Sequence, residues 1–102
     1  MAKFVYLYTG GQMAATPQEQ EKAMQEWGAW FAALGESVTD MGNPFGSSAT
    51  VSSAGTAEGG TSRAGGYSIV SADSLDDASA RTKGCPALAG GGTVEVYEAI
   101  EM

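Results

Sequence analysis

Histidine is absent from this sequence of 102 residues, and cysteine occurs only once, at Cys85. Without histidine, the chain cannot form a Ser-His-Asp or Cys-His catalytic arrangement, because both use an imidazole as the base. A single cysteine excludes an internal disulfide and, with no histidine beside it, argues against a zinc site. The sequence therefore predicts neither a bound metal nor a cofactor.

Positive charge is also scarce, since five Lys and Arg residues stand against 12 Asp and Glu residues, for a formal net charge of −7. The five cations are scattered along the chain, at Lys3, Lys22, Arg63, Arg81 and Lys83. Nucleic acids and anionic membrane surfaces attract proteins through clustered cations. We therefore expect neither of them as a partner.

Long apolar runs are missing as well. No stretch approaches the ~20 apolar residues that a membrane-spanning helix needs. The N-terminal residues lack the apolar region and cleavage site of a secretory signal. A single cysteine is compatible with a reducing compartment. Together these features favour a cytoplasmic protein.

The composition, 43% hydrophobic and 17% charged, fits one folded domain over residues 1–102. Residues 3–9 are rich in aromatic and β-branched side chains and predict a first strand. Successive side chains of a strand point to opposite faces, and both faces are apolar here, with Phe4, Tyr6 and Tyr8 on one and Val5 and Leu7 on the other. Such a strand is typical of the middle of a sheet that is covered on both sides.

The clearest helix signal begins at Thr16. Thr16 is a capping residue, Pro17 suits the first helical position, and Glu19 completes a capping box. Apolar residues follow at spacings of three and four and form one stripe, made of Ala23, Trp27, Trp30, Phe31 and Leu34. Gly35 is a typical helix end.

The remaining signals are shorter. We expect strands at residues 36–40, 67–72 and 93–101, and a second helix that starts at Ser74 and ends at Gly84 and Pro86. Residues 46–66 are rich in Gly, Ser, Thr and Ala. They form either a flexible linker or an irregular hairpin with a short strand at 49–53, and we favour the hairpin because Ala49-Thr50-Val51 has strand character.

The resulting order, β-α-β-β-α-β, predicts an α+β fold of ferredoxin-like type, with an antiparallel sheet that carries two helices on one face. Two helices on one face leave the other face bare, although the first strand is apolar on both sides. A second copy of the chain, related by a two-fold axis, is the simplest cover. The pattern therefore predicts a homodimer in which one sheet lies against another.

Several short motifs, in their order and spacing, resemble the YCII-related (DGPF-type) proteins over nearly the whole chain. They are Trp27, Trp30 and Phe31 in the helix, Ala-Leu-Gly at 33–35, Val-Thr-Asp-Met-Gly at 38–42, Ala-Thr-Val at 49–51, Gly-Gly-Tyr-Ser-Ile-Val at 65–70, Ser-Leu-Asp-Asp-Ala at 74–78, Cys-Pro at 85–86 and Gly-Gly-Thr-Val-Glu-Val at 91–96.

The resemblance implies a ferredoxin-like fold that pairs into a dimeric α/β barrel, and a largely unassigned role that includes small catabolic enzymes. Part of the family is associated with a catalytic His-Asp pair. This chain has no histidine, and the Asp-Gly-Pro-Phe signature is replaced by Thr-Ala-Glu-Gly-Gly at 56–60. Any activity that depends on those motifs is not implied here.

Asp40 is the candidate catalytic residue, because a carboxylate at a strand end beside a tight turn can act as a base. The alternative is a turn-capping Asp that accepts backbone N–H groups. Candidate ligand-binding residues are Tyr8, Trp27, Asn43 and Tyr67, which offer rings and hydrogen-bonding groups. The tyrosines and tryptophan equally suit a core or an interface.

Two further residues have a structural and a functional interpretation. Cys85 lies near the negative end of a helix, which disfavours a thiolate, so a structural thiol is the better interpretation. Glu98 falls on the apolar side of the last strand, as an edge residue or as a pocket carboxylate.

Three functional hypotheses follow. The favoured one is a homodimer that binds a small organic ligand in a cleft near the sheet and the first helix. The second is a small enzyme, similar to a lyase or isomerase, that acts on an organic acid or an aromatic breakdown product with Asp40 as base. The third is an accessory domain that binds another protein through the Gly/Ser-rich hairpin.

Overall fold

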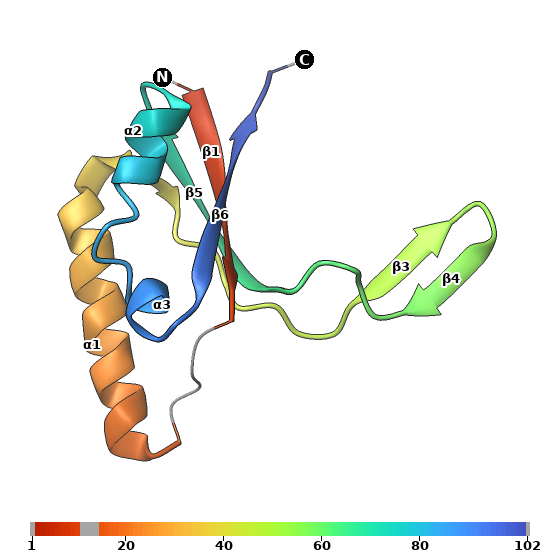
Figure 1. The fold of residues 1–102 in the computed structure, drawn as a ribbon, viewed down its shortest axis with the longest axis horizontal. Coiled ribbons are helices and arrows are strands. Elements are labelled where there is room, and N and C mark those ends of the chain that lie inside the picture. Colours follow the sequence, from red (N-terminus) through yellow and green to blue (C-terminus); the bar gives the residue numbers. More distant parts are fainter. Residues whose placement is uncertain (1, 11–14, 102) are drawn as a thin grey trace.

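The computed structural model describes residues 2–10 and 15–101 as an α+β arrangement with a four-stranded antiparallel sheet (Figure 1). The strands are β1 (Ala2–Thr9), β2 (Val38–Asp40), β5 (Ala64–Ala72) and β6 (Thr93–Ala99), in the order β2-β5-β1-β6. β1 pairs with β5 on one side and with β6 on the other, so it is a central strand, as its apolar composition predicts.

Three helices lie on one side of this sheet: α1 (Pro17–Leu34), α2 (Leu75–Ala80) and α3 (Pro86–Ala89) (Figure 1). The predicted cap of α1 is confirmed. Thr16 Oγ1 accepts the Glu19 N–H at 3.1 Å, and Glu19 Oε2 accepts the Ala15 N–H at 2.8 Å. These bonds satisfy backbone donors that have no partner inside the helix. None of the helices in the described ranges is long and apolar enough to cross a membrane.

Several predicted boundaries are wrong. The strand expected at 36–40 is only Val38–Asp40, because Gly35, at φ +59°, starts a 3-10 turn, η1 (Gly35–Ser37). The second helix ends at Ala80, before Gly84, and Pro86 begins α3, where its fixed φ suits the first helical position. The predicted strand at 67–72 extends back to Ala64, and the last strand ends at Ala99.

The core lies between the sheet and the helices. Side chains from β1 and β5 that point to the helices are buried, and so are Trp30 of α1, Ala78 of α2 and Cys85 beside α3. The ladder register pairs Phe4 with Val70 and Tyr6 with Ser68. β6 adds Val94 and Val96, which are partly buried against the same cluster.

On the other side of the sheet, no helix of the described residues lies over the strands (Figure 1). The register places an apolar group of side chains there, which we call the open face: Val5, Leu7, Tyr67, Ile69 and Tyr97. Polar residues on the same side flank this group, with Glu95 opposite Leu7 and the pair Lys3 and Ser71 beyond Val5. Four of the open-face side chains are half-buried by their neighbours, whereas Tyr97 is 52% exposed. The expectation that both faces of β1 are apolar is therefore met, with one face covered by this chain's own helices.

Residues 46–66 contain the expected hairpin. β3 (Ala49–Ser52) pairs with β4 (Gly55–Glu58) in a separate two-stranded sheet. Figure 1 shows the large sheet nearly edge-on, with the helices on one side and this hairpin projecting on the other. We call residues 49–58 the arm. Every residue of the arm is exposed.

Candidate functional site

Tyr8 and Trp27, two candidate ligand-binding residues, meet on the helix-covered side of the sheet. Their ring centroids lie 4.9 Å apart in an edge-to-face arrangement. The Tyr8 hydroxyl donates to Ser68 Oγ at 2.8 Å, and Ser68 Oγ donates to the Met41 carbonyl at 2.6 Å. Burial raises the pKa of Tyr8 well above its usual range. Tyr8 therefore stays protonated, and its hydroxyl is used within the fold.

The neighbouring rings extend this cluster. Tyr6 and Trp30 stack with centroids 6.0 Å apart, and Phe31 lies against both Trp27 and Trp30. The polar atoms of the two buried rings have internal partners: Tyr6 Oη donates to the Ala78 carbonyl at 2.5 Å, and Trp30 Nε1 donates to the Arg81 carbonyl at 3.2 Å. The rings thus occupy the space between α1 and the sheet where a cleft was expected.

The Asp40 side chain caps the turn that follows β2. Its Oδ1 accepts the Gly42 N–H at 2.8 Å, and the residue is exposed. This is the turn-capping geometry weighed in the sequence analysis. Gly42 has φ +73°, and a Cβ built on it would lie 1.7 Å from the Tyr67 carbonyl oxygen. The turn therefore brings the chain very close to β5, and the Asp40 carboxylate helps to set its shape.

Asn43 and Tyr67 lie on this same edge of the sheet. The Tyr67 N–H donates to the Asn43 carbonyl at 3.3 Å, so the pairing with β5 continues beyond β2. The Tyr67 ring belongs to the open face and stacks on Phe45, with centroids 5.8 Å apart and planes 13° apart. The register separates the two tyrosines, because Tyr67 pairs with Leu7 and shares its face, whereas Tyr8 points to the opposite face.

The five candidate residues are therefore distributed over three places. Tyr8 and Trp27 lie under the helices, Tyr67 lies on the open face, and Asp40 and Asn43 lie on the turn after β2.

No family model matches the chain, and no curated protein matches it. The resemblance to YCII-related proteins rests on the quoted residues alone and stays a prediction. The candidate site must therefore be argued from its own geometry.

One shallow hollow of about 420 Å³, open to solvent, lies at the margin of the open face, and none of the five candidates lines it. It is lined by Thr9, Thr61, Ser62, Arg63, Glu95 and Tyr97. β1 and β6 supply one wall, and the segment that leads from the arm into β5 supplies the other. Sequence reasoning missed this hollow, because it depends on two registers: β1–β6 pairs Thr9 with Thr93, and β1–β5 pairs Thr9 with Ala64, the residue after Arg63.

The hollow carries both signs of charge and an aromatic ring. The Tyr97 hydroxyl donates to Glu95 Oε2 at 3.4 Å, and the Thr9 and Thr93 hydroxyls hydrogen-bond to each other. The Arg63 guanidinium has the planar, forked shape that suits a carboxylate. The hollow is open to solvent; Arg63 can pair with a carboxylate, whereas Glu95 can accept a hydrogen bond from a hydroxyl and opposes further negative charge.

A second hollow, of about 410 Å³, lies where β1 begins and β6 ends. Glu98, the other carboxylate weighed in the sequence analysis, is on its rim with Lys3. Both residues are exposed. Among residues 2–10 and 15–101, no three Cys, Asp or Glu side chains come together as metal ligands would.

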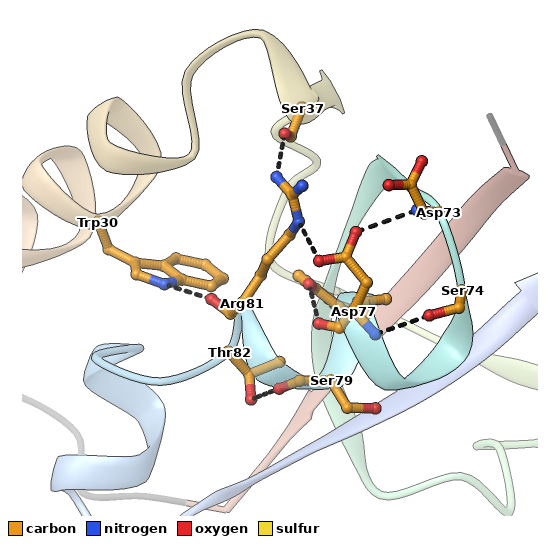
Figure 2. A network of polar contacts seen from close by, with 10 residues as sticks. Trp30, Ser37, Asp73, Ser74, Asp77, Ser79, Arg81 and Thr82 are labelled. Carbon is orange, nitrogen blue, oxygen red and sulfur yellow. Dashed lines mark hydrogen bonds and ion pairs between the residues drawn. The ribbon is translucent and has the colours of Figure 1, made fainter.

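The densest polar network belongs to α2 (Figure 2). Ser74 Oγ accepts the Asp77 N–H at 3.0 Å, and Asp77 Oδ1 accepts from Arg81 Nε at 3.2 Å. Arg81 also donates to Ser37 Oγ. A hydrogen bond from the Asp73 N–H, and then Arg81, lower the pKa of Asp77. These bonds fasten α2 to η1, so we assign the network a structural role.

Cys85 is buried between α2 and α3. Burial is the main reason that its thiol pKa is raised. A raised pKa and a buried sulfur both oppose nucleophilic chemistry. This geometry agrees with the structural interpretation of Cys85.

Proposed function

We propose that this protein is a homodimer of ferredoxin-like subunits that pair through their open faces and bind a small organic acid at the margin of that interface. The observation that carries the proposal is the open face, a group of apolar side chains over which no helix of residues 2–10 and 15–101 lies. The strand order and the position of the helices on one side are compatible with the ferredoxin-like arrangement.

Pairing of two open faces gives these side chains the cover that they lack. Apolar faces of sheets typically pack about 10 Å apart with interdigitated side chains. A two-fold axis would place the open face of each subunit against the same surface of its partner. Phe45, which is 50% exposed and stacked on Tyr67, widens the apolar surface along the β2 edge.

The resemblance to YCII-related proteins supports the same pairing, because that family forms dimeric α/β barrels. Its His-Asp chemistry is not part of the proposal, since the chain has no histidine. Asp40 is not carried forward as a base either, because its carboxylate accepts from Gly42 and lines neither of the two hollows.

The ligand is proposed from the hollow at Arg63. A carboxylate would pair with the guanidinium, and the Tyr97 ring and the threonine hydroxyls would contact the remainder of the molecule. The hollow adjoins the open face, so a second subunit would cover part of it. Cover of this kind removes water from the ligand and strengthens the ion pair.

The pairing is tested by comparing Ile69→Lys with Met24→Lys. Ile69 is in the middle of the open face, whereas Met24 is 75% exposed on α1, on the helix side. Ile69→Lys should give a monomer in sedimentation equilibrium, with tryptophan emission that shows an intact core, and Met24→Lys should remain a dimer. An Ile69→Lys protein that stays fully dimeric would remove the proposed interface.

The ligand is tested by calorimetric titration with malate, lactate and citrate. We expect heat from at least one of these acids with the wild type and none with Arg63→Gln. Lys83→Gln is the matched control, because it removes one cation outside both hollows. Equal binding by Arg63→Gln and the wild type would contradict this assignment of the site.

A further inference from the structure

The arm is the one part of the described chain that extends away from the sheet–helix body (Figure 1). It leaves the sheet where β2 and β5 meet their connecting segments, and it projects on the side of the open face, opposite to α1. The open face and the arm therefore bound a concave angle. Anything that covers the open face must lie beside the arm.

The arm has no core of its own. A two-stranded hairpin is at best marginally stable in water when nothing packs against it. All ten residues from 49 to 58 are exposed, and Val51, the single large apolar side chain among them, is 74% exposed. The structure of the arm thus gains little from burial within this subunit.

The arm has few of the features that keep free strand edges apart. Exposed edges are commonly protected by charged residues or proline. Among residues 49–58, Glu58 at the end of β4 is the single charged residue and there is no proline, in a chain that is 17% charged overall. Both strands of the arm are edges, because β3 and β4 pair with each other in a two-stranded sheet. Their outward N–H and C=O groups are open to another chain.

The arm is long enough to reach past a second sheet. The molecule extends 44 Å along the axis on which helices, sheet and arm follow one another (Figure 1). A helix layer on a sheet accounts for roughly 20 Å of this length. The remainder, roughly 20 Å, is about twice the ~10 Å that separates two packed sheets. An arm of this reach spans the end of a partner sheet placed on the open face.

We infer that the arm of each subunit crosses the end of the partner's sheet in the homodimer and packs against that second copy of the chain. The inference rests on the homodimer proposed above and adds a second, exchanged contact to it. Two arms related by the two-fold axis would hold the pair of sheets from opposite ends.

Removal of the arm tests this inference. The Gly59 N–H donates to the Ser48 carbonyl at 2.9 Å at the base of the arm. Replacement of residues 49–58 by Asn-Gly therefore closes the chain with a two-residue turn that keeps this bond. Trp27 and Trp30 lie in the core, so their emission reports whether the shortened chain still folds.

The measured quantity is the dimer dissociation constant, from sedimentation equilibrium of the full chain and of the arm-less chain. We expect the arm-less chain to dissociate at least tenfold more readily, with unchanged tryptophan emission. Equal dissociation constants would overturn the role of the arm while leaving the homodimer standing. A wild-type chain that is monomeric at millimolar concentration would overturn both.

Hydrogen exchange in the intact chain provides the second measurement. In the dimer, the outward amides of β3 or β4 should exchange more slowly at micromolar concentration than at a concentration where the wild type is dissociated. Arm amides that exchange at the same rate in both samples would contradict the contact, even if the arm-less chain fails to fold.

Discussion

Gly42 lies where the backbone passes very close to a neighbouring strand. A β-carbon there would meet the Tyr67 carbonyl oxygen at 1.7 Å, and the φ of +73° disfavours any other residue. Gly42→Ala should therefore lower the free energy of unfolding by about 3 kcal/mol. Gly28→Ala is the control, because Gly28 is exposed within α1 with no atom within 4 Å of an added Cβ.

Gly28→Ala should raise the free energy of unfolding by about 0.8 kcal/mol, through helix propensity alone. Urea denaturation measures both variants. Similar effects of the two substitutions would show that the close approach at Gly42 is not a constraint on this fold.

The Tyr6 hydroxyl satisfies a carbonyl that the short helix α2 leaves open. Tyr6 is fully buried, and its Oη donates to the Ala78 carbonyl. Tyr6→Phe keeps the ring and removes the donor, so a buried acceptor loses its partner. We expect a loss of about 1–2 kcal/mol in the free energy of unfolding, measured by urea denaturation. An unchanged free energy of unfolding in Tyr6→Phe would mean that a water molecule donates to the Ala78 carbonyl in place of the hydroxyl.

Alkaline pH should weaken the fold through the same residue. Burial raises the pKa of Tyr6 from 10.0 to about 12. Above pH 10 the unfolded chain releases this proton first, so the free energy of unfolding should fall as the pH rises from 10 to 12. Tyr6→Phe should show a smaller fall over this range. An identical pH dependence in both proteins would rule out Tyr6 as a source of the effect.

At the scale of elements, the cap of α2 gives a direct prediction. Ser74 Oγ accepts the Asp77 N–H, and helix caps of this kind contribute about 1 kcal/mol. Ser74→Ala should lower the free energy of unfolding by about that amount. Ser79→Ala, at an exposed position inside the same helix, should leave it nearly unchanged, and thermal unfolding of both variants checks the difference.

The helix and the strand that have a distinct capping or apolar pattern in their own residues could be predicted from the sequence. The cap at Thr16 and the stripe that contains Trp30 predict α1, and the apolar side chains on both faces of residues 3–9 predict that β1 is central in the sheet. The direction of the arm could not be predicted, because its small polar residues have no apolar period that selects a face. The strand β4 was missed for the same reason.

The candidate site was predictable only in part, because it depends on register. The sequence identifies Tyr8 and Tyr67 as aromatic residues on strands, but only the pairing of Leu7 with Tyr67 separates the two tyrosines. The hollow at Arg63 forms because residues 61–63 lie beside Glu95 and Tyr97 of β6. No local sequence motif indicates that these two segments are neighbours. Asp40 was correctly placed beside a turn, where it accepts from Gly42.

At the scale of the molecule, one face of the sheet is covered by helices and the other by nothing within the described chain (Figure 1). The small size of the core makes this imbalance important, because short chains bury a small fraction of their surface. A second copy on the open face would bring further apolar area out of water at about 25 cal/mol per Å². The proposed dimer would thus stabilise the subunit as well as cover part of the proposed ligand site.

The most direct test of this account is the mass of the wild-type chain in solution, measured by sedimentation equilibrium at micromolar concentration. The account predicts a mass near twice the 10.4 kDa of one chain. A mass that stays at 10.4 kDa as the concentration rises to the millimolar range would contradict the pairing of open faces.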